Sequence, residues 1–276
     1  MKTIFQVTNE IKEFKIQGAN QIALYGLIFL KDVLSREGFG KRFISASQRL
    51  ERARPTAVVL HNCIKIIMSE PSISTINSLI VRLQTVAKRE SVYSDKIIKS
   101  NSRIITYCHS GEAMSFIKHA SMAHKKKISV TACKTDPLRQ GIITAKELKE
   151  AKIPVTLIDD NAIGFFMKDQ DMVIIGADAL RKEGVVNKIG TSLLAQAAHE
   201  SSKPLYVVAN LLKIDRRKRF EIEERSPDEI KKNLDGKNLA GIRIRNPAFD
   251  ITPWKHVTCV INENGIFTRK KLGRLL

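Results

Sequence analysis

The sequence predicts an α/β protein, with a helical N-terminal domain over residues 1–100 and a Rossmann-like parallel-sheet domain over residues 101–276. Three observations predict this class. Up to residue 100, apolar residues recur three and four apart, which is typical of amphipathic helices. From Arg103 onward, short apolar runs bounded by turns alternate with helical segments, as in a parallel sheet covered by helices on both faces. With 43% hydrophobic residues among 276, the chain can bury a large core.

The first domain is predicted to be a bundle of helices. Thr8 is the candidate N-cap of the first helix, and Gly38 ends the second. Pro55 is predicted to lie in the first turn of a later helix, where its missing N–H is not needed. The predicted helical segments are, in order, residues 8–16, 20–38, 45–53, 55–69 and 72–100.

The second domain is predicted to alternate strands with helices. Its strands are expected at residues 103–108, 127–133, 154–160, 172–178, 204–210 and 257–265, and its helices at 111–124, 144–151, 161–169 and 188–202. The continuous apolar run MVIIG at 172–176 is typical of a strand buried on both faces. No strand is followed by GxGxxG, and GxxxxGK[ST] does not occur, so we expect no nucleotide cofactor.

Composition narrows the classes of function. The net charge of +19, densest at residues 124–127, 215–219 and 269–274, either attracts an anionic partner such as RNA or reflects solvated helix faces. Aromatic residues, at 6%, do not interleave with these runs, which disfavours a stacking platform for single strands. The four cysteines show no CxxC or CxxH spacing, so neither a disulfide framework nor a metal site is expected. Without a membrane-spanning run or a signal peptide, we expect a cytoplasmic protein.

Polar residues stand at the carboxyl ends of the predicted strands, where open parallel sheets bind ligands. Cys108 precedes a helix that is predicted to begin near Ser110, and the positive end of that helix favours the thiolate. Cys108 and Asp178 on neighbouring strand ends form a candidate acid/base pair, although a lone cysteine is more often a small buried side chain. The other candidates at this edge are Asp159, Asp160, Asn210, and Asn187 with Lys188, which are predicted to open the helix at 188–202.

Five blocks, taken in order, resemble one protein superfamily: ARPTAVVLHN (53–62), TYCHSG (106–111), QGIITAKEL (140–148), IIGADALRKEGVVNKIGTSLLA (174–195) and NPAFDITPWKHV (246–257). This superfamily contains the alpha, beta and delta regulatory subunits of initiation factor 2B and two isomerases, which act on methylthioribose 1-phosphate and ribose 1,5-bisphosphate. The resemblance covers nearly the whole chain. It implies a helical N-terminal domain, a Rossmann-like C-terminal domain, and homodimers formed through the latter.

The resemblance also implies site residues. The isomerases use a cysteine and an aspartate as their catalytic pair, and these correspond to Cys108 and Asp178 here. They hold phosphate with an N-terminal Arg-Gly-Ala turn, the arginine of an RPTAV block, a further arginine and an Asn-Lys pair. The candidate ligand-binding residues in this chain are therefore Gly18, Arg54, Asn187 and Lys188.

Two positions depart from the isomerase pattern. Gln17, in the turn before Gly18, and Asp136 stand where the isomerases have arginine. Against a phosphate dianion, these changes remove two cations and add an anion. Each charge-assisted hydrogen bond stabilises by about 1.5–3 kcal/mol, so we expect phosphate binding more than about 100-fold weaker. Lys134 or Arg139 is the candidate substitute cation.

From this charge balance we favour a non-enzymatic relative of the initiation factor 2B regulatory subunits. Such a protein would bind initiation factor 2 or other translation components without catalysing nucleotide exchange. The alternative is an aldose–ketose isomerase of a phosphorylated sugar, of the ribose 1,5-bisphosphate type, that uses Cys108 and Asp178. A third hypothesis is a site that senses a phosphorylated metabolite without turning it over. The sequence leaves the ligand, the direct partner and the assembly beyond a dimer open.

Overall fold

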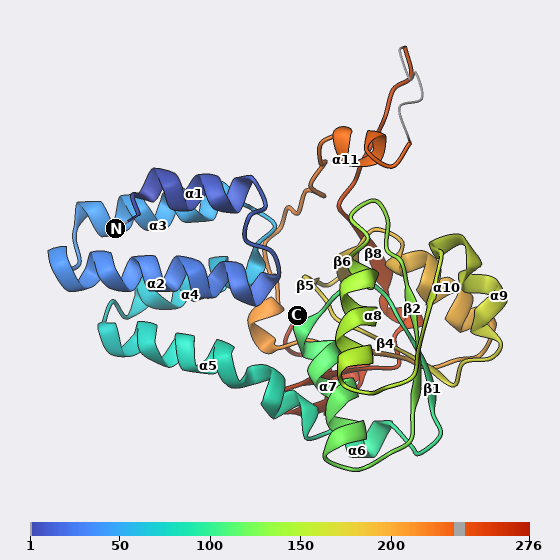
Figure 1. Cartoon of the computed structure of the whole chain (residues 1–276). Coiled ribbons are helices and arrows are strands. Elements are labelled where there is room, and N and C mark those ends of the chain that lie inside the picture. The colour runs from blue at the N-terminus through green and yellow to red at the C-terminus, as the bar shows by residue number, and fades with distance from the viewer. Residues whose placement is uncertain (1, 235–240) are drawn as a thin grey trace.

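The computed structural model of the chain describes residues 2–234 and 241–276. Figure 1 shows two parts side by side, a group of helices coloured blue to cyan and a sheet with helices packed on its faces. The helices of the first part are α1 (Ile4–Lys12), α2 (Ala19–Glu37), α3 (Lys41–Ala53), α4 (Val58–Ser69) and α5 (Ile73–Ser91), while the short α6 (Ser94–Ile97) lies against the second part (Figure 1). The helical N-terminal region and the α/β class are as predicted.

Local chemistry sets the helix ends, and two predicted ends are wrong. Thr3, rather than Thr8, forms a capping box at the start of α1. Thr8 lies inside that helix, where its side chain is buried. Gly38 ends α2 as predicted, at a φ of 70° that favours glycine. Helix α4 begins at Val58, because Pro55 lies in a turn that precedes the helix instead of opening it.

The main sheet has β4 at its centre and β1 beside it, and the order in which the chain adds strands reverses between these two. Its strands, in spatial order, are β10 (Gly265–Phe267), β9 (Cys259–Asn262), β7 (Leu205–Val208), β4 (Met172–Ile175), β1 (Arg103–Thr106), β2 (Ser129–Cys133) and β3 (Val155–Ile158). All neighbours are parallel except β10 and β9. The chain adds β2 and β3 on one side of β1 and then β4 on the other, so β1 and β4 flank the topological switch point.

Helices and turns connect these strands and cover the sheet (Figure 1). They are α7 (Gly111–Met122), α8 (Gln140–Glu150), α9 (Ile163–Met167), α10 (Thr191–Glu200), α11 (Asp228–Lys231), α12 (Arg269–Leu272) and three short 3₁₀ turns, η1 (Asp160–Ala162), η2 (Leu211–Lys213) and η3 (Trp254–His256). Strand β4 is buried at every position, as the run MVIIG predicts. The carboxyl ends of β7, β4, β1 and β2 therefore share one edge, which we call the carboxyl edge.

A second, three-stranded antiparallel sheet was not predicted. It consists of β5 (Ala179–Leu180), β6 (Gly184–Lys188) and β8 (Phe249–Pro253). Asn187 and Lys188 close β6 instead of opening the next helix, which begins at Thr191. Asn187 belongs to a strand because it pairs with Asp250 of β8. The two paired segments are far apart in sequence, and neither carries a local strand signal. Asp250 also accepts a hydrogen bond from the Gly190 N–H at 2.7 Å and so caps the start of α10.

The two parts are packed against each other through apolar and polar contacts. Leu212, which follows β7, is buried in the same apolar cluster as Leu27 and Phe43 of the helical part. The Asn62 side chain donates hydrogen bonds to the carbonyls of Leu212 and Ile214, both at 2.8 Å. Helix α5 also packs along α7. These contacts hold the start of α2 over the carboxyl edge. In the described residues, no helix is both long and apolar enough to cross a membrane.

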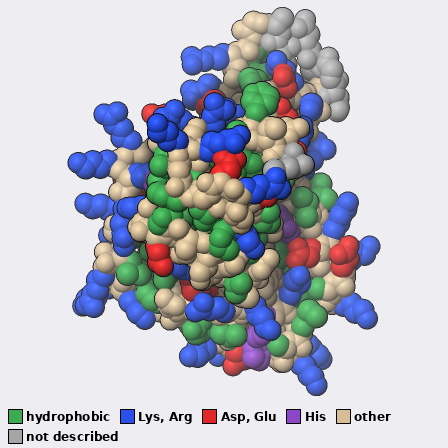
Figure 2. All heavy atoms as spheres, turned by 90° about the vertical axis from the view of Figure 1, so that its left-hand side faces the viewer, with side chains coloured by type: hydrophobic (Ala, Val, Ile, Leu, Met, Phe, Trp, Pro, Cys, Tyr) green, Lys and Arg blue, Asp and Glu red, His purple; other side chains and the backbone are tan. Residues whose placement is uncertain are grey.

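Basic side chains are spread over the surface of the helical part. Figure 2 looks onto this side, and the Lys and Arg side chains lie around the whole face with few acidic ones between them. The net charge of +19 is therefore dispersed on this side and does not form a single stripe. A dispersed field attracts anions generally but selects none.

Candidate active site

Cys108 and Asp178 flank the switch point, as their positions after β1 and β4 require. Cys108 has a φ of 65°, in the left-handed region. Its backbone is held on both sides: its N–H donates to Thr135 Oγ1 at 2.8 Å, and its carbonyl accepts from Thr144 Oγ1 at 2.8 Å. Such strain in a residue that is not glycine is common at functional sites, where neighbouring contacts hold it.

The end of β4 and the start of α7 approach each other closely beside Cys108 and Asp178. A Cβ built on Gly176, just after β4, would lie 2.2 Å from Ser110 Oγ. Only glycine therefore lets the end of β4 approach the start of α7. Ser110 is the N-cap of α7, close to the predicted helix start, and its Oγ accepts from the Ala113 N–H at 3.3 Å. This contact brings the segments of Cys108 and Asp178 together.

The surroundings of Cys108 favour the protonated thiol, against the expectation that the start of α7 favours the thiolate. Burial raises the pKa of Cys108 to about 11, although the Lys188 ammonium lowers it. The thiol donates to Gln140 Oε1 at 3.3 Å, and Gln140 Nε2 in turn donates to Gln17 Oε1 at 3.3 Å. Loss of water around the sulfur therefore outweighs the positive end of α7.

Asp178 lies in the same electrostatic environment. Burial raises the pKa of its carboxyl, whereas the charges of Lys188 and Arg54 lower it. The Asp178 carboxylate in turn raises the pKa of Cys108. The two side chains thus act on each other, and both are shifted towards their protonated forms. Such a pair can exchange protons with a bound molecule in either direction.

Lys188 is the cation common to both members of this pair. Its side chain is buried, with the residue only 8% exposed, and its Nζ lies 5.7 Å from the centroid of the Phe249 ring. Among the described residues, neither an ion pair nor a hydrogen bond of its ammonium is found. Asn187 is engaged differently, since its Nδ2 donates to Thr191 Oγ1 at 3.0 Å. A lysine in a largely buried position whose ammonium lacks a carboxylate partner is suited to an anionic ligand.

Arg54 and Gly18 come to the site from the helical part. The Arg54 guanidinium donates to Glu223 Oε2 at 3.2 Å and lies over the Phe14 ring, 4.7 Å from its centroid. Its charge reaches Asp178. Gly18, at a φ of 84°, is exposed and directly precedes α2. Arg54 is therefore partly neutralised by Glu223, and Gly18 offers only backbone groups.

Asp136 does not present a free anion. Lys134 forms ion pairs with Asp136 at 2.8 Å and with Asp159, and Arg139 Nε lies 3.6 Å from Asp136. Asp160 accepts the backbone N–H groups of Thr135 and Asp136, each at 2.7 Å, and so braces this turn. Lys134 and Arg139 thus balance the charges of Asp136 and Asp159. The expected charge change of three units overstates the loss, because the added carboxylate is already paired.

A buried polar cluster at the same edge was missed by the sequence analysis. We call it the Glu112 cage, and it consists of Glu112, Lys213, Asn210 and Asn20. Glu112 Oε2 forms an ion pair with Lys213, and its Oε1 accepts from Asn210 Nδ2 at 2.5 Å and Asn20 Nδ2 at 3.3 Å. Only Asn210 was predicted, from its place after β7. Glu112 and Lys213 gave no sequence signal, because each looks like an ordinary charged residue of a helix or loop.

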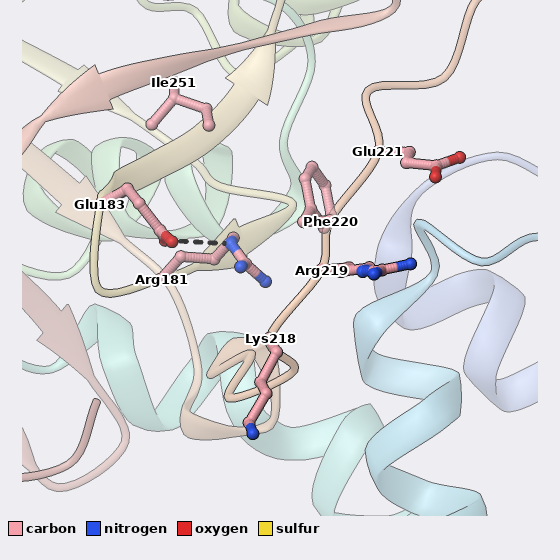
Figure 3. A pocket seen from close by; sticks show the side chains of 7 residues that line it. All are labelled: Arg181, Glu183, Lys218, Arg219, Phe220, Glu221 and Ile251. Carbon is pink, nitrogen blue, oxygen red and sulfur yellow. Dashed lines mark hydrogen bonds and ion pairs between the residues drawn. The ribbon is translucent and has the colours of Figure 1, made fainter.

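A cavity of about 320 Å³ lies away from this site. It is lined by Arg181, Glu183, Lys218, Arg219, Phe220, Glu221 and Ile251 (Figure 3). Arg181 is fully engaged, since it forms ion pairs with Glu183 and with Asp215 and donates to the Arg217 carbonyl. Figure 3 shows Arg219 and Glu221 pointing away from Arg181. None of the predicted site residues lines this cavity.

Comparison with known proteins changes the functional interpretation. The ribose 1,5-bisphosphate isomerase of Methanocaldococcus jannaschii is 36% identical over 289 residues, which covers 96% of this chain and 92% of the relative. The methylthioribose-1-phosphate isomerase of Acetivibrio thermocellus is 35% identical over 304 residues, covering 96% and 88%. These similarities contradict our hypothesis of a non-enzymatic translation subunit and favour the isomerase alternative. The hypothesis had rested on a charge balance that counted Asp136 as an unpaired anion, whereas Asp136 is paired with Lys134.

Solved structures agree on the fold. The Pyrococcus horikoshii protein described as translation initiation factor eIF-2B superimposes with a TM-score of 0.84 at 26% identity, covering 96% of this chain and 97% of that one. The family described as the initiation factor 2 subunit family matches residues 15–269. Its match extends from the turn before α2 to the start of α12 and so spans every element that forms the site. The chain belongs to the initiation factor 2 subunit family.

Proposed function

We propose that the protein is an aldose–ketose isomerase of a phosphorylated sugar, with Cys108 and Asp178 as its catalytic pair. The observation that supports this most is the arrangement at the switch point. A thiol and a carboxyl, both shifted towards their protonated forms by burial, share one nearby ammonium, that of Lys188, which has no partner among the described residues. The names of the relatives point to the same class of reaction.

The proposed reaction moves protons only and needs no redox partner. Asp178 gives its proton to the ring oxygen as the bond between that oxygen and C1 breaks. Cys108, which first releases its thiol proton to water and regains one after the cycle, takes the proton from C2 as the thiolate, so that a C1–C2 double bond forms. Cys108 then returns that proton to C1, and Asp178 recovers a proton from the C2 hydroxyl, which becomes the ketone. Both side chains end as they began, and the phosphate ester is kept.

Lys188 is proposed to hold the phosphate of the substrate. A phosphate dianion would supply the negative partner that its ammonium lacks among the described residues. Arg54, Asn187 and the backbone at Gly18 are proposed as further contacts. Because Arg54 is paired with Glu223, its contribution requires that this 3.2 Å hydrogen bond be exchanged for one to the ligand.

The test is turnover by the purified protein. The sugar phosphates would be ribose 1,5-bisphosphate and 5-methylthioribose 1-phosphate, with the ketose product followed by NMR. Cys108→Ser and Asp178→Asn are each expected to lower kcat by about 100-fold or more. Cys63→Ser is the matched control, because Cys63 is a buried thiol in the apolar core of the helical part. A protein that converts neither sugar, or a Cys108→Ser variant as active as the control, would refute the proposal.

We further propose the organisation of the molecule around this activity. Residues 1–100 and 101–276 are the two domains, and two copies associate through the second, in the cytoplasm. We place the surface of this association on α9 and α10, which contact each other and carry exposed apolar side chains. Phe165 of α9 is 67% exposed and Leu193 of α10 is 57% exposed. Light scattering of the purified protein would test it. A dimer that persists in Phe165→Glu with Leu193→Glu would exclude this surface.

A further inference from the structure

We propose that Glu112 determines the substrate class, because its carboxylate fills an anion-binding position at the carboxyl edge. The enzyme would then prefer a sugar with a single phosphate and an uncharged far end over a bisphosphate. This inference rests on the proposed isomerase function and narrows its substrate.

The donors around Glu112 are those that an anionic ligand would need. The Lys213 ammonium, the side-chain amides of Asn20 and Asn210, and the Asn210 N–H at 3.3 Å all donate to its two oxygens. Glu112 lies in the first turn of α7, where the helix dipole also favours a negative charge. Glu112 and Lys213 are 3% and 4% exposed, so water does not compete for these donors. An internal carboxylate is thus held as a bound anion would be.

The cage lies beside the proposed catalytic pair. Glu112 is four residues after Cys108, and Asn210 directly follows β7 at the same edge. Residues 17–20 connect the Cys108 thiol with the Glu112 cage. Gln17 contacts Gln140, which accepts a hydrogen bond from the thiol, and Asn20 contacts Glu112. A sugar between Cys108 and Asp178 would therefore have the Glu112 cage at one side.

The charges of the two buried lysines decide how many phosphates fit. Lys188 has no partner among the described residues, whereas Lys213 is neutralised by Glu112. The segment that leads to the cage carries the uncharged Gln17 and Asn20, so it adds no further cation. A first phosphate thus has a buried partner. A second phosphate would meet the Glu112 carboxylate, whose charge repels it and whose donors are already used.

A purely structural role for Glu112 predicts a different outcome. If Glu112 only ties α7 to η2 and α2, replacing it would lower stability and slow both substrates alike. If it sets the substrate class, replacing it would change the ratio of the two activities. The ratio of kcat/KM for ribose 1,5-bisphosphate to that for 5-methylthioribose 1-phosphate separates these outcomes.

The experiment compares the wild type with Glu112→Gln and Glu112→Ala. We expect the wild type to favour the monophosphate by at least about 10-fold, and Glu112→Ala to raise the relative activity on the bisphosphate by at least about 10-fold. Glu112→Gln, which keeps the size of the side chain, should shift the ratio in the same direction. Glu70→Gln, at the exposed end of α4, is the control. A wild type that prefers the bisphosphate, or a ratio unchanged in both Glu112 variants, would overturn the proposal.

A second measurement is independent of turnover. Inorganic phosphate should raise the melting temperature of Glu112→Ala more than that of the wild type, because the emptied cage exposes Lys213 to the added anion. An equal shift in the two proteins would refute the anion-binding position. If neither sugar is converted by the wild type but phosphate stabilises Glu112→Ala selectively, the isomerase proposal fails while the anion position is supported. If both measurements fail, so do both proposals.

Discussion

Replacing Glu90 with glutamine is expected to stabilise the protein at neutral pH and to change its stability little near pH 5. Glu90 is fully buried at the end of α5, and neither of its carboxyl oxygens has a hydrogen-bond partner in the described residues. Burial raises the pKa of Glu90 from 4.5 to about 8, while the charge of Lys213 lowers it and that of Glu263 raises it. At neutral pH the folded protein therefore keeps a proton that the unfolded chain releases.

The sign and size of the effect follow from this difference in proton binding. Between pH 4.5 and about 8, the folded state binds the proton more tightly than the unfolded state. Stability thus falls as pH rises, by about 1.4 kcal/mol per pH unit for this one group. From about pH 5 to about pH 7.5 the loss reaches about 3 kcal/mol. Glutamine has no proton to lose, so Glu90→Gln should escape this loss.

Urea unfolding at these two pH values measures the effect. The gain in free energy of unfolding from Glu90→Gln should be about 3 kcal/mol larger at the higher pH. Comparing two pH values cancels any fixed cost of burying an amide in place of a carboxylic acid. Glu70→Gln, at the exposed end of α4, serves as the control. If Glu90→Gln and the wild type lose stability in parallel, the buried carboxyl is not protonated and the reasoning is wrong.

Three further predictions test the site and its framework. Lys188→Met is expected to raise the KM for a sugar phosphate by about 10-fold or more, because one charge-assisted hydrogen bond contributes about 1.5–3 kcal/mol. Steady-state kinetics measures this KM, and an unchanged value would exclude Lys188 from the phosphate site. Gly176→Ala should lower stability by about 1–3 kcal/mol, because the added Cβ would lie 2.2 Å from Ser110 Oγ; a melting temperature equal to that of the wild type would contradict this. Asp215→Ala should destabilise the protein by about 3–5 kcal/mol, because it leaves the Arg181 guanidinium without its closest buried partner. Chemical unfolding measures this loss, and a clearly smaller loss would contradict the prediction.

The sequence predicted the order of strands and helices well, because each continuous apolar run is a local property. Strands β1, β2, β3, β4, β7 and β9 all lie within their predicted ranges. The positions of Cys108 and Asp178 at strand ends followed from the same runs. The resemblance blocks identified the family, which the match over residues 15–269 confirms.

Other features needed the folded chain. The second sheet exists because β6 pairs with β8, more than sixty residues away, and so Lys188 ends a strand instead of opening a helix. The charge balance at Asp136 also depended on contact, since Lys134 pairs with it and with Asp159. Counting charges along the sequence therefore treated Asp136 as an unpaired charge.

By itself, the amino-acid sequence determined the class of fold, the family, and which thiol and carboxyl stand at the ends of neighbouring strands. Tertiary structure alone decided which of the charged groups remain available there. Coulomb interaction depends on the distance between charges and on the water around them, and both are set when segments remote in sequence meet. Lys188 is buried without a partner, whereas Lys213 is buried against Glu112, and nothing in their sequence neighbourhoods distinguishes these two lysines.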